Sequence, residues 1–193
     1  MFREPIVITG LGVLACNGLG RKPFWKAIER GQSGIRPITR FDATNLPCRI
    51  GGELWDFNPE DFMKRSVVHT WCRHVHQGLA SAKLAVEDAE LEKASYDRDR
   101  IATGIGTSIG GPNEEYQAHV EAFESGGYNK VGKLASAKFS GHSATVHVTI
   151  DLGFRGPAIT ISSGCSTGLD TIAWGVNQLR SGRCDAAVGG ATE

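Results

Sequence analysis

The stretch AITISSGCSTGLD, residues 158–170, places nucleophilic side chains at a turn. Apolar and small residues lead up to Gly164, Cys165 and Ser166 follow, and helical spacing then resumes. Two nucleophiles fit this pattern. Gly164, Ser166 and Gly168 satisfy the G-x-S-x-G nucleophile elbow with Ser166 attacking, and alternatively Cys165 attacks. A buried structural cysteine without chemistry is a third interpretation, because unpaired cysteines are common in protein interiors.

The expected local structure favours the thiol over the hydroxyl. Backbone amides at the first turn of a helix attract negative charge, so they stabilise both a thiolate and a developing oxyanion. A serine hydroxyl gains less from this field, because it also needs an adjacent base to take its proton. The residues of this turn therefore favour Cys165, and they leave Ser166 and a structural cysteine open.

Two glycine-rich turns carry weaker signals for phosphate binding. Gly10, Gly12 and Ala15 fit the G-x-G-x-x-A dinucleotide fingerprint, but no helix opens there and no acid follows about 20 residues later. The stretch GIGTSIGGP, residues 104–112, lacks the Gly-Lys-Ser/Thr ending of a phosphate loop. We interpret both as strand ends that pack closely against neighbouring structure.

One helical segment concentrates possible metal ligands. His69, Cys72 and His76 would share a face of a single helix, a geometry that could hold zinc. Their spacing matches no standard zinc motif, and a fourth ligand is not evident. We therefore predict no metal and interpret the segment as a helix surface with incidental histidines.

The elements that must position these residues alternate along the chain. Strands are predicted at 5–12, which is short and buried, at 48–54, which is partly exposed, at 99–111, which runs into a glycine turn, and at 156–162 and 184–193. Helices are predicted at 22–31, about 66–90, 112–126, 141–153 and 166–182. In the last helix, an apolar face is formed by Leu169, Ile172, Ala173, Val176 and Leu179. This alternation is typical of layered α/β proteins with a mostly parallel sheet.

Composition excludes several function classes. The 193 residues are 40% hydrophobic and carry a formal net charge of zero, which provides no electrostatic footprint for nucleic acid or an anionic membrane. The five cysteines have irregular spacing without a CxxC pair, which favours a reducing compartment. No apolar run approaches the roughly 20 residues that span a bilayer, and no signal peptide is recognised. We expect a cytoplasmic protein without nucleic-acid or membrane partners.

Several segments, in register along the whole chain, resemble one family. They are IVITGLGVLACNGLG, FWKAIERGQSGIRPITRFDA, GIGTSIGG, LGFRGPAITISSGCSTGLD and CDAAVGGATE. Together they are similar to the β-ketoacyl-acyl-carrier-protein synthases of the KAS II-like, elongating type, which act in fatty acid and polyketide biosynthesis. The resemblance implies a thiolase-like fold with a five-stranded sheet. It identifies residues 1–193 as the N-terminal, nucleophile-bearing half of a two-half αβαβα architecture.

The resemblance also implies a chemistry, and it selects Cys165 rather than Ser166. Cys165 would take an acyl chain from a carrier-protein thioester, with its own backbone N–H as an oxyanion donor. Malonyl-carrier protein would then lose carbon dioxide, and the enolate would attack the acyl-enzyme in a decarboxylative Claisen condensation. Ile109 would limit the depth of the acyl pocket. No metal or organic cofactor is implied.

The remaining catalytic groups of the family fall outside this chain. The two catalytic histidines and the lysine belong to the C-terminal half, and none of the six histidines here matches their motifs. We therefore expect the 193-residue chain alone to be an inactive acyltransferase fragment. Expected partners are acyl- and malonyl-loaded acyl carrier protein, and a second copy or a related subunit in a homodimer or heterodimer. Alternatives are a thiolase-like or CoA-dependent synthase, a non-catalytic partner subunit, or a serine hydrolase using Ser166.

Overall fold

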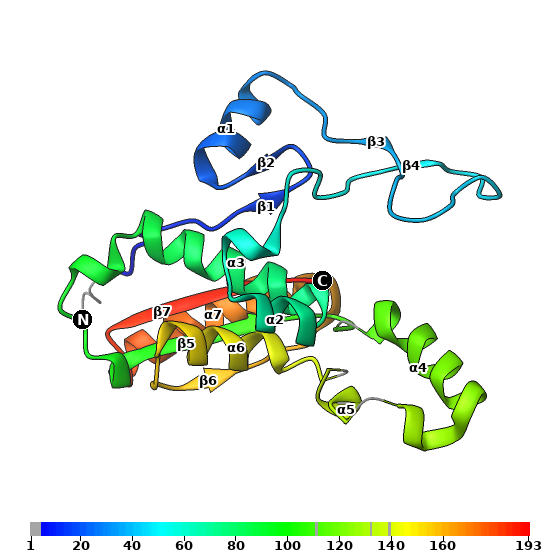
Figure 1. Ribbon diagram of the computed structural model, residues 1–193. Coiled ribbons are helices and arrows are strands. Elements are labelled where there is room, and N and C mark those ends of the chain that lie inside the picture. Colours follow the sequence, from blue (N-terminus) through cyan, green and yellow to red (C-terminus); the bar gives the residue numbers. More distant parts are fainter. Residues whose placement is uncertain (1–4, 111, 132, 139) are drawn as a thin grey trace.

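A three-stranded parallel sheet lies at the centre of the protein. The computed structural model describes residues 5–110, 112–131, 133–138 and 140–193. Strand β5 (Ile101–Gly106) is the middle strand and pairs in parallel with β6 (Ala158–Ile159) and β7 (Ala186–Ala191). Helices cover both faces of this sheet (Figure 1). The layered α/β class with a parallel sheet is therefore confirmed.

Every residue of β5 is buried, and the side chains on the two faces of the strand differ in size. Ile105 points into an apolar core, while Gly104 and Gly106 face a helix on the opposite side. Full burial on two faces is what a central parallel strand requires, because helices cover it above and below.

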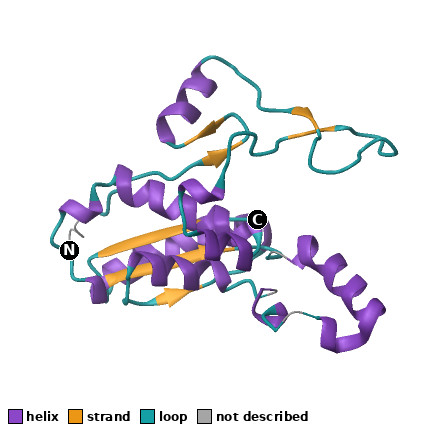
Figure 2. Ribbon diagram, in the orientation of Figure 1, coloured by secondary structure: helices purple, strands orange, loops and turns teal. Residues whose placement is uncertain are grey.

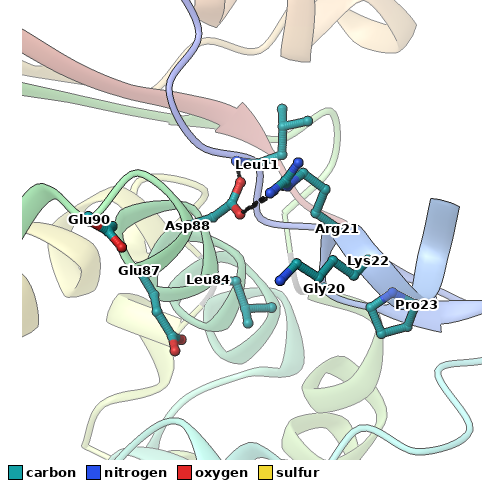
Figure 3. A pocket seen from close by; sticks show the side chains of 9 residues that line it. All are labelled: Leu11, Gly20, Arg21, Lys22, Pro23, Leu84, Glu87, Asp88 and Glu90. Atoms are coloured by element: carbon teal, nitrogen blue, oxygen red, sulfur yellow. Dashed lines mark hydrogen bonds and ion pairs between the residues drawn. The ribbon is translucent and has the colours of Figure 1, made fainter.

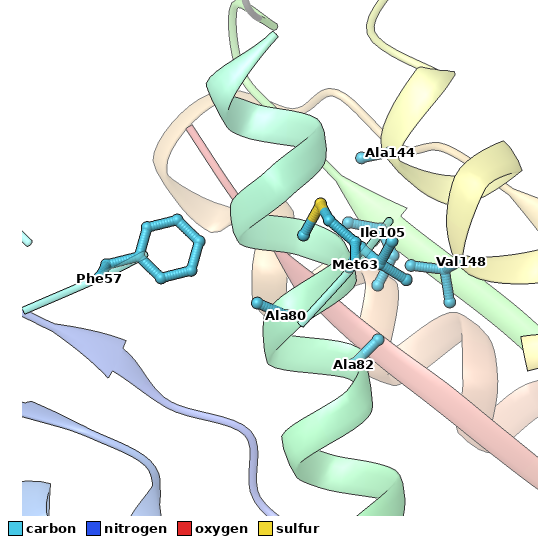
Figure 4. Close-up of a cluster of buried hydrophobic side chains, with 8 residues drawn as sticks. Phe57, Met63, Ala80, Ala82, Ile105, Ala144 and Val148 are labelled. Atoms are coloured by element: carbon cyan, nitrogen blue, oxygen red, sulfur yellow. The ribbon is translucent and has the colours of Figure 1, made fainter. Parts of the chain in front are cut away.

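Helices α3 (Arg73–Asp88) and α6 (Ser143–Leu152) cover one face of the sheet with apolar side chains. Leu79 and Val148 are completely buried there, in contact with Ile105 of β5. Phe57 and Met63 close the same cluster from the segment before α3 (Figure 4). This cluster is the main hydrophobic core of the described residues.

Helix α7 (Thr167–Arg180) covers the opposite face in a different way. Its buried residues are small or polar, and they are Thr167, Thr171, Gly175 and Gln178. The expected apolar face is wrong in part: Leu169 is 73% exposed and Ile172 is 41% exposed. The glycines of β5 explain the difference in part, because their missing side chains leave room for Thr167, Thr171 and the ring of Trp174 against the strand.

Most of the remaining elements extend away from the layered body (Figure 2), but α2 (Arg65–Thr70) lies against it, with Val67 and Val68 packed on the main core. Antiparallel pairs join β1 (Leu14–Ala15) to β2 (Gly18–Leu19) and β3 (Arg36–Pro37) to β4 (Ile50–Gly51). The other helices are α1 (Arg21–Glu29), α4 (Pro112–Gly126) and α5 (Ala135–Lys138). Each helix in the described part of the chain is too short or too polar to cross a membrane.

The sheet has three strands in the described residues rather than the expected five. The predicted strand at 5–12 is an extended segment beside α3: a Cβ at Gly10 would lie 2.1 Å from the Ala85 carbonyl oxygen, and one at Gly12 would lie 1.7 Å from that of Ser81. Val7 and Ile8 of this segment remain 70% and 75% exposed. Its apolar run predicts burial, but no partner strand pairs with it among the described residues.

Two other predicted elements also differ. The strand expected at 48–54 is reduced to β4, which pairs with β3 outside the main sheet. The single helix expected at about 66–90 is interrupted between α2 and α3, where Trp71 and Cys72 have extended backbone. The helices predicted at 22–31, 112–126, 141–153 and 166–182 are confirmed, as are the strands that became β5 and β7.

Candidate functional site

Cys165 lies in a strand–turn–helix, as the sequence predicts. After β6, a 3₁₀ turn over Gly164–Ser166 leads directly into α7. Gly164 has a φ of 72°, in the left-handed region that glycine adopts without steric cost. The chain can therefore reverse sharply and leave the Cys165 thiol exposed just before the first residue of the helix.

This turn lies where the carboxyl ends of all three sheet strands meet. Just beyond β5, the N–H of Thr107 donates to the Ile161 carbonyl at 3.2 Å. Just beyond β7, the N–H of Thr192 donates to the Gly106 carbonyl at 3.0 Å. Ligands of open α/β sheets bind at this edge, so the thiol stands in the position where the fold places chemistry.

Hydroxyl groups hold the turn in place. Ser108 Oγ, from the loop after β5, donates to the Gly164 carbonyl at 2.9 Å. Ser162 Oγ donates to the Ser108 carbonyl at 3.0 Å, so the two loops are tied in both directions. Thr167 Oγ1 donates to the same Gly164 carbonyl at 2.7 Å and accepts the N–H of Ser163 at 3.0 Å.

The hydrogen bonds of Ser166 argue against its role as a nucleophile. Its hydroxyl donates to Asp170 Oδ2 at 2.9 Å, and Ser163 Oγ donates to the same oxygen. These two hydroxyls, Ser163 first and then Ser166, hold the pKa of Asp170 below its usual range. Asp170 is therefore a weak base near neutral pH, and an activated serine needs a stronger one.

The exposure of Cys165 also argues against a purely structural cysteine. Cys72 and Cys184 are buried, which is the usual environment of an inert thiol, whereas Cys165 is exposed. For Cys184, burial raises the pKa of the thiol, which favours the unreactive protonated form. Attack by Cys165 stays a prediction, and the exposure of its thiol, which Cys48 shares, is compatible with it.

Ile109 lies in the same region but stays a prediction. It directly follows Ser108, whose hydrogen bonds join its loop to the Cys165 turn. Its side chain is 68% exposed. A role in limiting an acyl pocket would require other residues to enclose it.

Residues 69–76 do not form the single helix face on which a metal site was considered. His69 lies on α2, Cys72 lies at the break, and His76 lies on α3, so the three do not share one helix face. Among the described residues, no group of three histidine, cysteine or acidic side chains is suited to a metal ion. The six histidines lie on α2, α3, α4 and α6 or at the start of α6, outside the turn that carries Cys165.

A cavity lies elsewhere, between the start of α1 and the end of α3 (Figure 3). It has a volume of about 440 Å³, and its walls are largely charged. Asp88 accepts the N–H of Leu11 at 3.0 Å and pairs with Arg21 at 2.8 Å, and these contacts, that of Leu11 first, lower the pKa of Asp88. The dinucleotide fingerprint is not supported here, because Gly10 and Gly12 pack against α3 and α1 begins only at Arg21.

Sequence reasoning missed the groups that support the turn. Ser108, Ser163, Thr167 and Asp170 all bond within it, yet none was a candidate. A signal was present in the runs of serine and threonine that follow both strands, at 107–108 and 162–163. Such residues commonly bond to nearby backbone groups in turns.

Comparisons with known proteins identify the family of this chain. Residues 3–193 match the family model described as "Beta-ketoacyl synthase, N-terminal domain". Among curated relatives, the "3-oxoacyl-[acyl-carrier-protein] synthase 2" of Coxiella burnetii is 32% identical over 100% of this chain and 46% of its own length. The "Tetracenomycin polyketide synthase ketoacyl synthase alpha subunit" of Streptomyces glaucescens is 32% identical over 97% of this chain and 45% of its own length.

Solved structures share the fold. The ishigamide ketosynthase/chain length factor superposes with a TM-score of 0.88 at 24% identity, covering 97% of this chain and 47% of its own. The ketosynthase of the AntDE:AntF complex superposes with a TM-score of 0.79 at 24% identity, covering 97% of this chain and 45% of its own. This chain spans about half the length of the curated relatives it matches. It belongs to the β-ketoacyl synthase family, whose N-terminal domain it matches from residue 3 to residue 193.

Proposed function

We propose that this chain is the nucleophile-bearing half of a condensing acyltransferase that acts in fatty acid or polyketide biosynthesis. The observation that carries the proposal is the exposed Cys165 thiol, at the start of α7 and beside the carboxyl ends of the three strands. Membership in the β-ketoacyl synthase family supports the reaction class. We place the protein in the cytoplasm, where the reducing environment keeps such a thiol free.

The first step is the transfer of an acyl chain to Cys165. Its sulfur attacks the thioester carbonyl of an acyl-loaded carrier protein, the Sγ–C bond forms, and the carrier sulfur leaves as a thiol. The tetrahedral intermediate carries an oxyanion, and the proposal assigns the backbone N–H of Cys165 as one of its donors. The amides at the start of α7 add to the positive potential at this point.

The second step forms the new carbon–carbon bond. A malonyl-loaded carrier protein loses carbon dioxide, and the resulting enolate attacks the acyl group on Cys165. The β-ketoacyl chain leaves on the carrier protein, and the thiol is regenerated. The proposal assigns the two histidines and the lysine that support this step to a C-terminal half outside residues 1–193.

Features of this chain support such a second half. Leu169 and Ile172 form an apolar surface on the outer side of α7. Strand β7 pairs only with β5 in the described residues, so one of its edges is open to a further strand. Exposed apolar surface next to an open strand edge is a typical interface between packed layers.

We also propose that the protein pairs with a second copy or a related subunit through the region of β6 and α6. Strand β6 forms the other edge of the sheet, and Val146 and Ile150 of α6 are 40% and 68% exposed. Two of the similar solved structures are ketosynthases in complex with a chain length factor, which supports a related subunit as one possible partner.

The test is a condensation assay on the complete protein with acyl- and malonyl-loaded carrier protein, measuring carbon dioxide release and the β-ketoacyl product. We expect Cys165→Ala to abolish the product and Ser166→Ala to retain it. Loss of activity in Ser166→Ala alone, with hydrolysis of the thioester in place of condensation, would instead identify a serine hydrolase.

Two further arms address the remaining alternatives. An acyl-CoA replaces the carrier-bound donor, and a clear preference for it would indicate a CoA-dependent synthase. The 193-residue chain is assayed alone, and we expect no carbon dioxide release from it. A complex is also assayed in which only this subunit carries Cys165→Ala. If the amount of product is unchanged, this subunit is a non-catalytic partner.

A further inference from the structure

One peptide unit of the Cys165 turn receives hydrogen bonds from two separate parts of the chain. The carbonyl of Gly164 accepts Ser108 Oγ at 2.9 Å and Thr167 Oγ1 at 2.7 Å. The backbone N–H of Thr167 also points to this oxygen, closing the 3₁₀ turn. Ser108 is 56 residues away from Gly164 in sequence, so this contact depends on the fold rather than on local geometry.

The other end of the same peptide unit is the N–H of Cys165. A trans peptide is planar, so its carbonyl and its N–H point in opposite directions and rotate together. Groups that hold the Gly164 carbonyl therefore also set the direction of the Cys165 N–H. This matters because Gly164 has a positive φ and carries no side chain, so no packing of its own restrains the peptide.

Ser108 is itself held in place. Its carbonyl accepts Ser162 Oγ at 3.0 Å, and the neighbouring N–H of Thr107 bonds to Ile161 at 3.2 Å. The loop after β5 is thus anchored to the segment after β6 at two points before the Ser108 hydroxyl reaches the turn. An anchored donor can fix a peptide direction, whereas a mobile one would follow it.

We propose that Ser108, together with Thr167, is a positioning residue that aims the Cys165 N–H at the oxyanion formed when Cys165 is acylated. The inference rests on the proposed function, because it requires an acyl transfer to Cys165. In that step the Sγ–C bond forms, the C–S bond of the donor thioester breaks, and the thiol proton passes to the departing sulfur. Ser108 touches neither the acyl group nor the thiol in this account. It acts through the peptide unit.

Two reactions of the Cys165 thiol can distinguish a role in aiming the Cys165 N–H from a role in maintaining the fold of the turn. Alkylation by iodoacetamide needs the thiolate but forms no oxyanion. Acylation by an octanoyl-N-acetylcysteamine thioester needs both. Both rates are measured at Cys165 on the complete protein, by peptide mapping and mass spectrometry across a range of pH.

We expect Ser108→Ala to slow acylation roughly tenfold, equivalent to about 1.4 kcal/mol of transition-state stabilisation. The alkylation rate and its pH profile should not change. Ser108→Thr keeps the hydroxyl and should restore acylation. Thr167→Val should reproduce the defect and provides a second test if Ser108→Ala does not fold. Ser181→Ala is the matched control, because its hydroxyl caps the far end of α7 by donating to Gln178 at 3.0 Å.

The outcomes separate the two proposals. Normal acylation in both Ser108→Ala and Thr167→Val would overturn the positioning role and leave the proposed function intact. Equal losses of acylation and alkylation would show that the hydroxyls only maintain the turn, which also overturns it. If the wild-type protein is alkylated but never acylated at Cys165, the proposed function fails and the positioning role fails with it.

Discussion

The two faces of the central sheet are built on different principles. On the face of α3 and α6, large apolar side chains such as Leu79 and Val148 fill the space above Ile105. On the face of α7, Gly104 and Gly106 contribute no side chain, and Thr167, Thr171 and the ring of Trp174 lie directly against them. The first face buries apolar surface, and the second brings a helix close to the strands.

This difference explains where the candidate nucleophile lies. A helix separated from the sheet by leucine or valine would start farther from the strand ends. Because Gly106 allows Thr167 to approach, the first turn of α7 reaches the edge where β5, β6 and β7 end. We conclude that the apolar face supplies most of the stability and that the glycine face positions Cys165.

The largest effect on stability is expected from Leu79→Ala, on the apolar face. Leu79 is completely buried, so the change leaves a cavity and should lower the free energy of unfolding by about 2–5 kcal/mol. Leu169→Ala, on the outer side of α7, is the matched control in the 193-residue chain and should change it by less than about 0.5 kcal/mol. Urea denaturation measures both. Equal losses would contradict the assignment of the core to the α3 and α6 face.

Gly106→Ala tests the close approach on the other face. The added Cβ would lie 2.2 Å from Thr167 Cγ2 and 2.8 Å from the Ile161 carbonyl oxygen, so α7 must shift outward. We expect a loss of about 1–3 kcal/mol in stability, together with slower acylation of Cys165. Gly190→Ala in β7 is the control, because its Cβ would meet nothing within 4 Å. Full acylation in Gly106→Ala would argue that close approach does not position the thiol.

Thr145→Val tests a polar contact within the apolar face. Thr145 Oγ1 accepts the N–H of Ile105 at 3.2 Å and donates to its carbonyl at 2.9 Å, which ties α6 to β5. Its removal leaves these groups unsatisfied and should cost about 1–2 kcal/mol by urea denaturation. Thr149→Val, on the same helix, removes only a bond to Val146 and should have little effect. If the two variants are equally stable, apolar burial alone holds α6.

The smallest effect is expected from pH at the start of α7. The hydroxyls of Ser163 and Ser166 lower the pKa of Asp170 in the folded state. The contribution of these bonds is therefore complete above the unfolded-state pKa of about 3.9, and it is lost as the pH falls through the lower folded-state pKa. We expect the stability difference between wild type and Asp170→Asn to shrink below about pH 4. A difference that grows with acidity would contradict the assignment of these bonds.

Prediction from sequence succeeded where local pattern decides the structure. The helices at 112–126 and 166–182 and the strands β5 and β7 follow from periodicity and from their flanking glycines. It failed for residues 5–12, whose apolar run predicts a sheet strand, because pairing depends on partners distant in sequence. It also failed for the buried side of α7, since the glycines of β5, about 65 residues earlier, select Thr167 and Thr171 over Leu169.

In the candidate site, too, local residues could be interpreted from the sequence, whereas contacts between distant residues could not be predicted. The residues of the turn alone left Cys165, Ser166 and a structural cysteine open, and the resemblance to a family selected Cys165. The contacts that hold the turn could not be predicted, because Ser108 reaches Gly164 across 56 residues. A serine after a strand predicts a backbone hydrogen bond, but not the carbonyl that accepts it.

We propose that close packing of α7 on the sheet presents Cys165, and not Ser166, as the acyl acceptor. The most direct test incubates the complete protein with an acyl-loaded carrier protein and maps the acyl group by mass spectrometry. We expect a thioester on Cys165 in the wild type, which is lost in Cys165→Ala and kept in Ser166→Ala. An ester on Ser166, or a thioester confined to Cys16, Cys48, Cys72 or Cys184, would contradict it.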